Sequence, residues 1–300
     1  MNLDLVYTVC FSDSFVITWR DALLQIFKYK TYYNFVIVPN ILGNKTYSYL
    51  PLLNYTDKTI ESIENSIRVV SEYSYQARVL NPNYRSFVKD DTVVMRIPLL
   101  GRNSDEVWKT TLPTNMKKQL KKSFKNNFLL KNGNDRDLIL DFYRLFSLTM
   151  KKFGTPVFGL DLFLKIPGFM KSKYYVVYFN NKPIAAMLLL FDEQIVWCPY
   201  SGSDESYTEL RPGHFMFWNG IKDACDQSKI LFDFGRSAFG NNNYFFKERW
   251  GAIPVKVDIL APNQLNIYKK YKLAGNIYKR LPNFISNYIG PPLCKRLPDL

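Results

Sequence analysis

Residues 174–201 read YYVVYFNNKPIAAMLLLFDEQIVWCPYS. Three apolar runs, 174–179, 184–191 and 195–201, are separated by two short polar turns, at residues 180–182 and at Asp192 and Glu193. Turns this short connect antiparallel neighbours, because a parallel crossover takes a dozen or more residues. The stretch therefore predicts a three-stranded antiparallel meander.

Helices are predicted on both sides of this meander. Upstream, residues 113–128 carry apolar side chains every four positions, and a second helix begins near Asp135 or Asp137 and ends at Gly154. Downstream, Pro212 opens a helix that is followed by a strand at 230–234 and another at 252–260. This order resembles that of the acetyltransferase (GNAT) fold, in which two central strands splay apart and the donor enters between them. By order, those strands would end at Tyr200 and Phe234.

The first hundred residues predict a small α/β unit, with helices at 15–27 and 60–73 and strands at 32–38, 46–53 and 92–99. We therefore expect an α/β (α+β) protein with tandem acetyltransferase-like (GNAT) domains and mixed, mostly antiparallel sheets. The expected divisions are a truncated N-terminal domain at 1–105, a C-terminal acyltransferase domain at 106–262, and a basic amphipathic helical tail at 263–300.

Composition indicates a folded cytoplasmic protein. Of the 300 residues, 47% are hydrophobic and 16% aromatic, which is enough to bury a full core. The N-terminus lacks the pattern of a signal peptide, and the longest apolar run is far shorter than a bilayer span. Cys10, Cys198, Cys225 and Cys294 have no paired spacing and His214 is the single histidine, so we expect neither disulfides nor a metal.

The net charge of +14 is concentrated in two blocks. Residues 101–170 contain 13 Lys and Arg against 6 Asp and Glu, and residues 261–300 contain 7 against 1. Such blocks attract polyanions, whether RNA, a pyrophosphate-bearing substrate or an anionic membrane face. In the first block, Lys117, Lys118 and Lys121 lie on the helix predicted at 113–128, where they form either a donor-binding surface or a solvated face.

Residues 231–251 read LFDFGRSAFGNNNYFFKERWG. A strand breaks at Gly235, passes Arg236 and an Asn-rich turn, and closes on aromatic rings beside fixed cations. That order is typical of a ligand site at the end of a strand, and it is equally consistent with a strand, a turn and a buried aromatic helix.

Several stretches in the same order resemble FemAB-like proteins, most closely the subgroup associated with extracellular polysaccharide loci. They are PTNMKKQLKKSFKNNF at 113–128, TMKKFGTP at 149–156, KPIAA at 182–186, YSGS at 200–203, FDFGRS at 232–237 and YFFKERWG at 244–251. The resemblance covers roughly residues 45–297. Members of this family join an amino acid from aminoacyl-tRNA to an amine of a cell-wall precursor, and related branches transfer other acyl groups.

The resemblance implies an acyltransferase whose donor is aminoacyl-tRNA or acyl-CoA, with no permanently bound cofactor. Its acceptor would be a small-molecule or lipid-linked glycan. The family's Phe-Lys pair falls on Phe246 and Lys247, which implies that Lys247 holds the aminoacyl ester during transfer. We expect catalytic roles for Lys247, Tyr200 and Asp233, although Asp233 is equally suited to a structural pair with Arg236. Expected substrate-binding residues are Phe246, Arg236, Tyr244, Ser201, His214, Lys117, Lys118 and Lys121.

Two other functions stay open. One is an acyl-CoA-dependent N-acetyltransferase that acts on an amino sugar, and the other is a non-catalytic scaffold that binds a glycan precursor or RNA.

The basic tail at 263–300 also has two interpretations. Leu273, Ile277 and Leu281 recur every four residues among basic residues, which predicts either a peripheral contact with the inner face of the membrane or packing against the protein.

Overall fold

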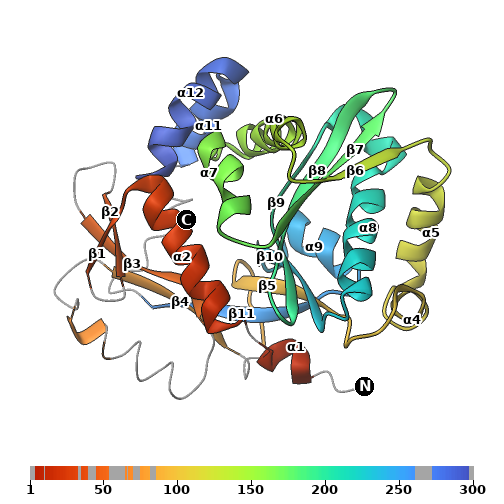
Figure 1. The fold of residues 1–300 in the computed structure, drawn as a ribbon, viewed down its shortest axis with the longest axis horizontal. Coiled ribbons are helices and arrows are strands. Elements are labelled where there is room, and N and C mark those ends of the chain that lie inside the picture. The colour runs from red at the N-terminus through yellow and green to blue at the C-terminus, as the bar shows by residue number, and fades with distance from the viewer. Residues whose placement is uncertain are drawn as a thin grey trace. The chain divides into compact units, whose positions relative to one another are not determined.

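The computed structural model describes residues 4–9, 11–32, 35–39, 45–53, 65, 67–69, 75–81, 86–260 and 272–296. The chain divides into two compact units, neither continuous in sequence (Figure 1). Unit 1 consists of Met1–Ser12, Asn81–Phe146 and Met170–Val257, and unit 2 consists of Asp13–Leu80, Ser147–Phe169 and Asp258–Leu300. The domain boundaries expected at 105 and 262 stay predictions.

Unit 1 is built on a mixed sheet in the order β11-β5-β10-β9-β8-β7-β6. The expected meander is confirmed as β7 (Ser172–Phe179), β8 (Lys182–Phe191) and β9 (Ile195–Ser203). The other strands are β5 (Thr92–Pro98), β6 (Leu129–Gly133), β10 (Leu231–Ala238) and β11 (Ile253–Leu260). β9 and β10 run parallel, whereas the neighbouring pairs in this unit are antiparallel.

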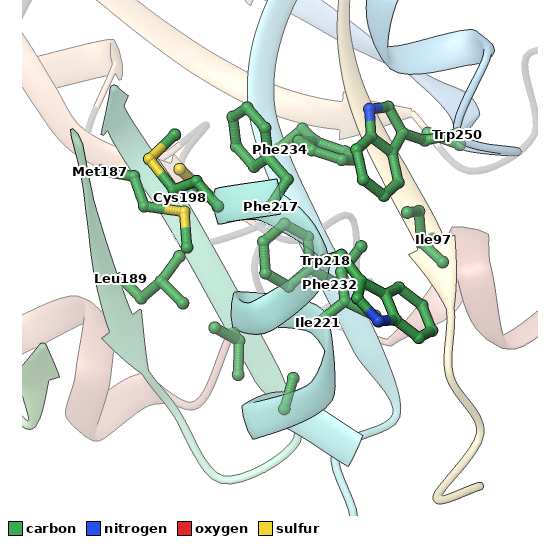
Figure 2. Close-up of a cluster of buried hydrophobic side chains, with 14 of the residues drawn as sticks. Ile97, Met187, Leu189, Cys198, Phe217, Trp218, Ile221, Phe232, Phe234 and Trp250 are labelled. Atoms are coloured by element: carbon green, nitrogen blue, oxygen red, sulfur yellow. The ribbon is translucent and has the colours of Figure 1, made fainter. Parts of the chain in front are cut away.

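Helices cover both faces of the meander, because its side chains alternate between two apolar layers. On one face, Tyr174 of β7 packs edge-on against Phe142 of α6 (Arg136–Phe153), with ring centroids 4.9 Å apart. On the other face of the meander, Tyr175 belongs to the core beneath α8 (Pro212–Asp226). Helices α4 (Ser104–Thr110) and α5 (Thr114–Ser123) also contact α8. Figure 2 shows this core, in which α8 contributes Phe217, Trp218 and Ile221, β8 contributes Met187 and Leu189, and β10 contributes Phe232 and Phe234.

The N-terminal segment of unit 1 packs against the same sheet through its backbone. It contains α1 (Asp4–Thr8), and the carbonyl oxygens of Val6 and Val9 accept hydrogen bonds from Arg96 of β5. Ser12 donates from its backbone and its hydroxyl to the Asp192 carboxylate.

The strands of unit 2 lie in the order β1-β2-β3-β4 and consist of Lys30–Tyr32, Phe35–Pro39, Lys45–Leu53 and Tyr75–Asn81. Only β3 and β4 are parallel among its described pairings. Its described helices include α2 (Asp13–Phe27), α7 (Leu160–Lys165), α11 (Lys272–Arg280) and α12 (Asn283–Cys294). A mixed, mostly antiparallel α/β architecture is thus confirmed, and no helix of the described ranges is long and apolar enough to cross a bilayer.

Three local expectations need correction. The helix predicted at 113–128 ends at Ser123, because the Asn126 side chain donates to the Ser123 carbonyl and competes with the next helical turn. The apolar positions of the two predicted helices include Phe124 in the first and Phe153 in the second, and both are expected to face inward, yet they are 43% and 50% exposed. The strand predicted at 32–38 divides between β1 and β2. The helix predicted at 60–73 lies almost wholly outside the described residues.

Candidate functional site

The pairing between β9 and β10 is short, and it ends where the sequence predicts that two strands splay. The parallel ladder joins only Ile195–Trp197 to Leu231–Asp233. Beyond it β9 continues along β8 as far as Ser203, and β10 continues along β5 as far as Ala238. We call this point, from Cys198 in β9 and Phe234 in β10 onward, the strand fork. Backbone groups released from a ladder are available to bind a ligand.

A β-bulge shapes the β10 side of the fork. Asp233 lies opposite Arg96, whereas Arg236 lies opposite Val94, so β10 carries one extra residue. Gly235 has a φ of +74°, and a Cβ atom there would lie 3.3 Å from the Cys198 carbonyl oxygen. Glycine therefore fits both the left-handed backbone and the close approach to β9.

Asp233 holds this bulge in place. One of its oxygens accepts from the Gly235 backbone N–H at 2.7 Å, and the other accepts from Arg96 Nε at 3.0 Å. Both side chains of the ion pair are buried. The partner of Asp233 is thus Arg96. The sequence had suggested Arg236 as its partner instead. Arg96 itself was missed, although a charged residue inside the apolar run 93–99 is a signal for a buried partner.

Lys247 extends from α9 (Asn242–Glu248) to the bulge. The Asn241 side chain caps this helix by accepting from the Tyr244 N–H at 2.7 Å. Lys247 Nζ donates to the carbonyl oxygens of Gly235 and Arg236, at 3.2 and 2.8 Å. Burial lowers the pKa of Lys247 to about 8, while nearby Asp233 and Cys198 oppose this shift. An ammonium has three protons, so one remains for a ligand.

Aromatic rings form the α8 side of the site. Phe246 packs against His214 and Phe217, with both centroid distances 5.8 Å, and the His214 ring stacks on Trp250 at 6.0 Å. Burial, followed by the charges of Arg211 and Arg249, lowers the pKa of His214 to about 4. His214 is therefore a neutral ring at physiological pH, suited to stacking or hydrogen bonding.

The depressed pKa of His214 predicts a stability effect. Between pH 6.5 and 4 the unfolded chain binds a proton at this position that the folded chain excludes, so folding stability falls as pH falls through this range. We expect the wild type to lose more stability between pH 7 and pH 5 than the His214→Phe variant does. Urea unfolding of both proteins at the two pH values measures the difference, and equal losses would contradict it.

Three further predicted site residues, Tyr244, Tyr200 and Ser201, make separate contacts of their own. Tyr244 is buried, packs on Phe239 at 4.7 Å and donates its hydroxyl to Glu248 at 2.8 Å. Tyr200 lies in β9 past the fork, on the α6 face, with its ring 5.2 Å from that of Phe146. Ser201 follows it, half-buried and opposite Met187 of β8.

The basic helix α5 is tied to the start of α8. Ser123 donates to the Arg211 carbonyl at 2.9 Å, and Arg211 Nε donates to Gln119 at 2.6 Å. Arg211 adopts the left-handed conformation immediately before Pro212. Lys118 and Lys121 are exposed, whereas Lys117 donates to the Lys109 carbonyl. The first turn of α8, a favourable position for an anion, thus lies beside a basic surface. Arg211 was not identified from the sequence as a candidate site residue.

Eight of the eleven predicted site residues therefore form two groups within unit 1, whereas Tyr244, Tyr200 and Ser201 belong to neither. Lys247, Asp233, Arg236, Phe246 and His214 gather at the fork and the start of α8, through the contacts above. Lys117, Lys118 and Lys121 lie on α5, which is connected to the same helix start through Arg211.

Residues 168–248 match the family described as acetyltransferase (GNAT) domain. None of the curated proteins matches the sequence. A solved structure of FemX is 12% identical, with a TM-score of 0.55 over 80% of this chain and 86% of that one. The C-terminal domain of a protein from Agrobacterium fabrum assigned as a lysylphosphatidylglycerol synthetase is 10% identical, with a TM-score of 0.55 over 91% and 92%. L-PGS from Bacillus licheniformis is 10% identical, with a TM-score of 0.50 over 87% and 96%. At these identities the likeness concerns the fold alone.

Proposed function

The chain has a FemAB-like GNAT fold, and on this premise we propose that it transfers an aminoacyl group from aminoacyl-tRNA to an amine of a cell-envelope polysaccharide or peptidoglycan precursor. The observation that carries the proposal is the Lys247 ammonium at the strand fork, held by two backbone carbonyls with one proton unused. It coincides with the lysine of the Phe-Lys pair by which the sequence resembles FemAB-like proteins.

The reaction needs an attacking amine, stabilisation of an oxyanion and a proton route. The neutral acceptor amine attacks the ester carbonyl carbon, a C–N bond forms and the carbonyl oxygen becomes an oxyanion. The C–O bond to the tRNA ribose then breaks, the nitrogen loses a proton and the ribose oxygen gains one. Lys247 donates its remaining N–H to the oxyanion, and backbone N–H groups at the fork add to this stabilisation.

The other catalytic candidates take different parts in this proposal. Both Asp233 oxygens already accept hydrogen bonds, from Gly235 and Arg96, so Asp233 acts by positioning the carbonyls that hold Lys247. Tyr200 is our candidate for returning a proton to the leaving oxygen, because it lies in β9 just past the fork. Phe246 and His214 form an aromatic wall for the donor.

The lysines of α5 would bind the tRNA backbone. We expect the triple variant Lys118→Gln, Lys121→Gln, Lys122→Gln to bind tRNA more weakly and with a flatter salt dependence. Each lost phosphate contact lowers the slope of log K against log salt by about 0.7–0.9. Lys122 is included because it is exposed, and Lys117 is omitted because of its bond to Lys109.

Filter binding of the variant and the wild type across a salt series measures these slopes. A control triple variant, Lys89→Gln, Lys165→Gln, Lys222→Gln, removes the same charge from exposed positions outside α5. If the α5 variant keeps the wild-type slope, this helix is a solvated face and does not bind RNA.

A coenzyme A donor is the second candidate, because the matched family is an acetyltransferase family and the start of α8 suits a pyrophosphate. Mass spectrometry of the purified protein under native conditions distinguishes the two donors. Co-purifying tRNA supports the first proposal. Bound coenzyme A without tRNA would replace it with an acyl-CoA-dependent N-acyltransferase.

A further inference from the structure

Helices α11 and α12 of unit 2 pack against each other through small and polar groups. The Tyr278 hydroxyl donates to the Ser286 carbonyl oxygen at 2.8 Å, and a Cβ atom added at Gly290 would lie 2.7 Å from that hydroxyl. Tyr278, Ser286, Gly290 and Cys294 are buried. Cys294 also contacts the Pro156 carbonyl, at 3.7 Å. The inner side of this helix pair is thus occupied by its own contacts.

The outer side is apolar and exposed. Leu273 and Ile277, one turn apart on α11, are 76% and 58% exposed. Phe284 and Tyr288, one turn apart on α12, are 75% and 83% exposed. On α12 these two positions lie opposite the buried Ser286 and Gly290, as the helical period requires. Large apolar side chains this exposed on neighbouring helices indicate an interaction surface.

Positive charge accompanies this apolar surface. Lys279 and Arg280 are exposed at the end of α11, and Lys295 and Arg296 follow α12. The end of α6 adds Lys152 beside the half-exposed Phe153, and a Cβ atom added at the next residue, Gly154, would lie 2.9 Å from Lys279 Cε. Neither α11 nor α12 contains an acidic residue.

We propose that the outer side of α11 and α12, which we call the tail surface, binds anionic lipid membranes. Exposed Leu, Ile, Phe and Tyr flanked by Lys and Arg match the requirements of a shallow interfacial helix, whose apolar face enters the boundary between headgroups and acyl chains. The basic residues then lie at the level of anionic headgroups.

Two other occupants fit the tail surface less well. A second copy of the chain would bring equal positive charges together, since residues 261–300 carry 7 basic residues and 1 acidic residue. A nucleic acid would pair with the cations but would leave Leu273 and Ile277 in water.

The structure also revises the apolar pattern of Leu273, Ile277 and Leu281 that the sequence predicts. Leu281 is half-buried, and Phe284 and Tyr288 take its place on the exposed side.

Vesicle flotation of the full chain tests the proposal. We expect the wild type to float with phosphatidylcholine vesicles rich in phosphatidylglycerol at low salt, and to float far less with pure phosphatidylcholine or at high salt. Leu273→Ser with Phe284→Ser should lower the bound fraction about tenfold by removing apolar anchors. Lys279→Glu with Arg280→Glu should lower it about 25-fold or more, because two cations are lost and each cation near an anionic leaflet contributes about a fivefold change.

Matched controls carry the same changes elsewhere. Two double variants of exposed residues in unit 1 serve as controls: Val88→Ser with Leu129→Ser, and Lys89→Glu with Lys222→Glu. Both should float like the wild type. Thermal unfolding of each variant verifies that it is folded. The proposal is overturned if the wild type stays unbound at low salt, or if the tail variants float as the controls do. It is also overturned if the chain is a dimer that the serine variants dissociate, because the tail surface would then join two copies.

Discussion

Lys247→Ala is expected to lower kcat for transfer by about 10²–10³-fold, the effect of removing a single oxyanion donor, in a protein that stays folded. The physical reason is that Lys247 Nζ lies at the fork, fixed by the carbonyls of Gly235 and Arg236, where water cannot substitute an equally oriented donor. Lys247→Arg is not expected to restore activity, because a planar guanidinium cannot occupy the position of a compact ammonium. Steady-state kinetics of both variants measure the change in kcat.

The pH dependence of the wild type provides a second readout of the same residue. Because the pKa of Lys247 is lowered to about 8, the ammonium is present below that pH and is lost above it. Activity should therefore fall as pH rises through about 8. Lys222→Ala, an exposed lysine of α8, is the matched control and should retain wild-type kcat. A Lys247→Ala variant within threefold of wild type would remove Lys247 from the mechanism.

Asp233→Asn is expected to cost about 3–5 kcal/mol of folding free energy, because it leaves the buried Arg96 guanidinium without its counter-charge. The amide can still accept from the Gly235 N–H, so the substitution tests the charge and not the hydrogen bond at the bulge. Urea unfolding measures the loss.

The exposed pair Asp161–Lys165 supplies the control for this experiment. Its side chains are 80% and 56% exposed and 4.0 Å apart, so Asp161→Asn should change the free energy of unfolding by less than about 1 kcal/mol. If Asp233→Asn proves as mild as Asp161→Asn, the charge of Asp233 does not stabilise the fold through Arg96.

The elements that sequence reasoning located correctly are those with strong local signals. The meander β7–β9 has apolar runs joined by turns too short for a crossover, and α6 has Asp137 in its first turn and Gly154 just past its end. The splay of β9 and β10 was expected because the order of elements resembles that of the acetyltransferase fold. The FemAB-like GNAT resemblance is confirmed as a fold by the family match and the solved structures.

The missed features depend on contacts between distant parts of the chain. Arg96 and Asp233 are 137 positions apart, and no local pattern connects them. Arg211 is linked to Gln119, 92 positions away. The short elements α4 and β6 have too few residues for a periodicity to be visible. The pKa of Lys247 depends on its burial in the folded chain, so only its identity could be predicted.

The central claim is that this chain converts an aminoacyl ester into an amide at Lys247. The most direct measurement incubates the purified protein with a mixed pool of radiolabelled aminoacyl-tRNA and a cell-envelope precursor extract, followed by mild alkali. Ester-linked label is released by alkali, whereas amide-linked label is retained. We predict alkali-stable label with the wild type and none above background with Lys247→Ala. Equal alkali-stable label from the two proteins, or none from either, would contradict the claim.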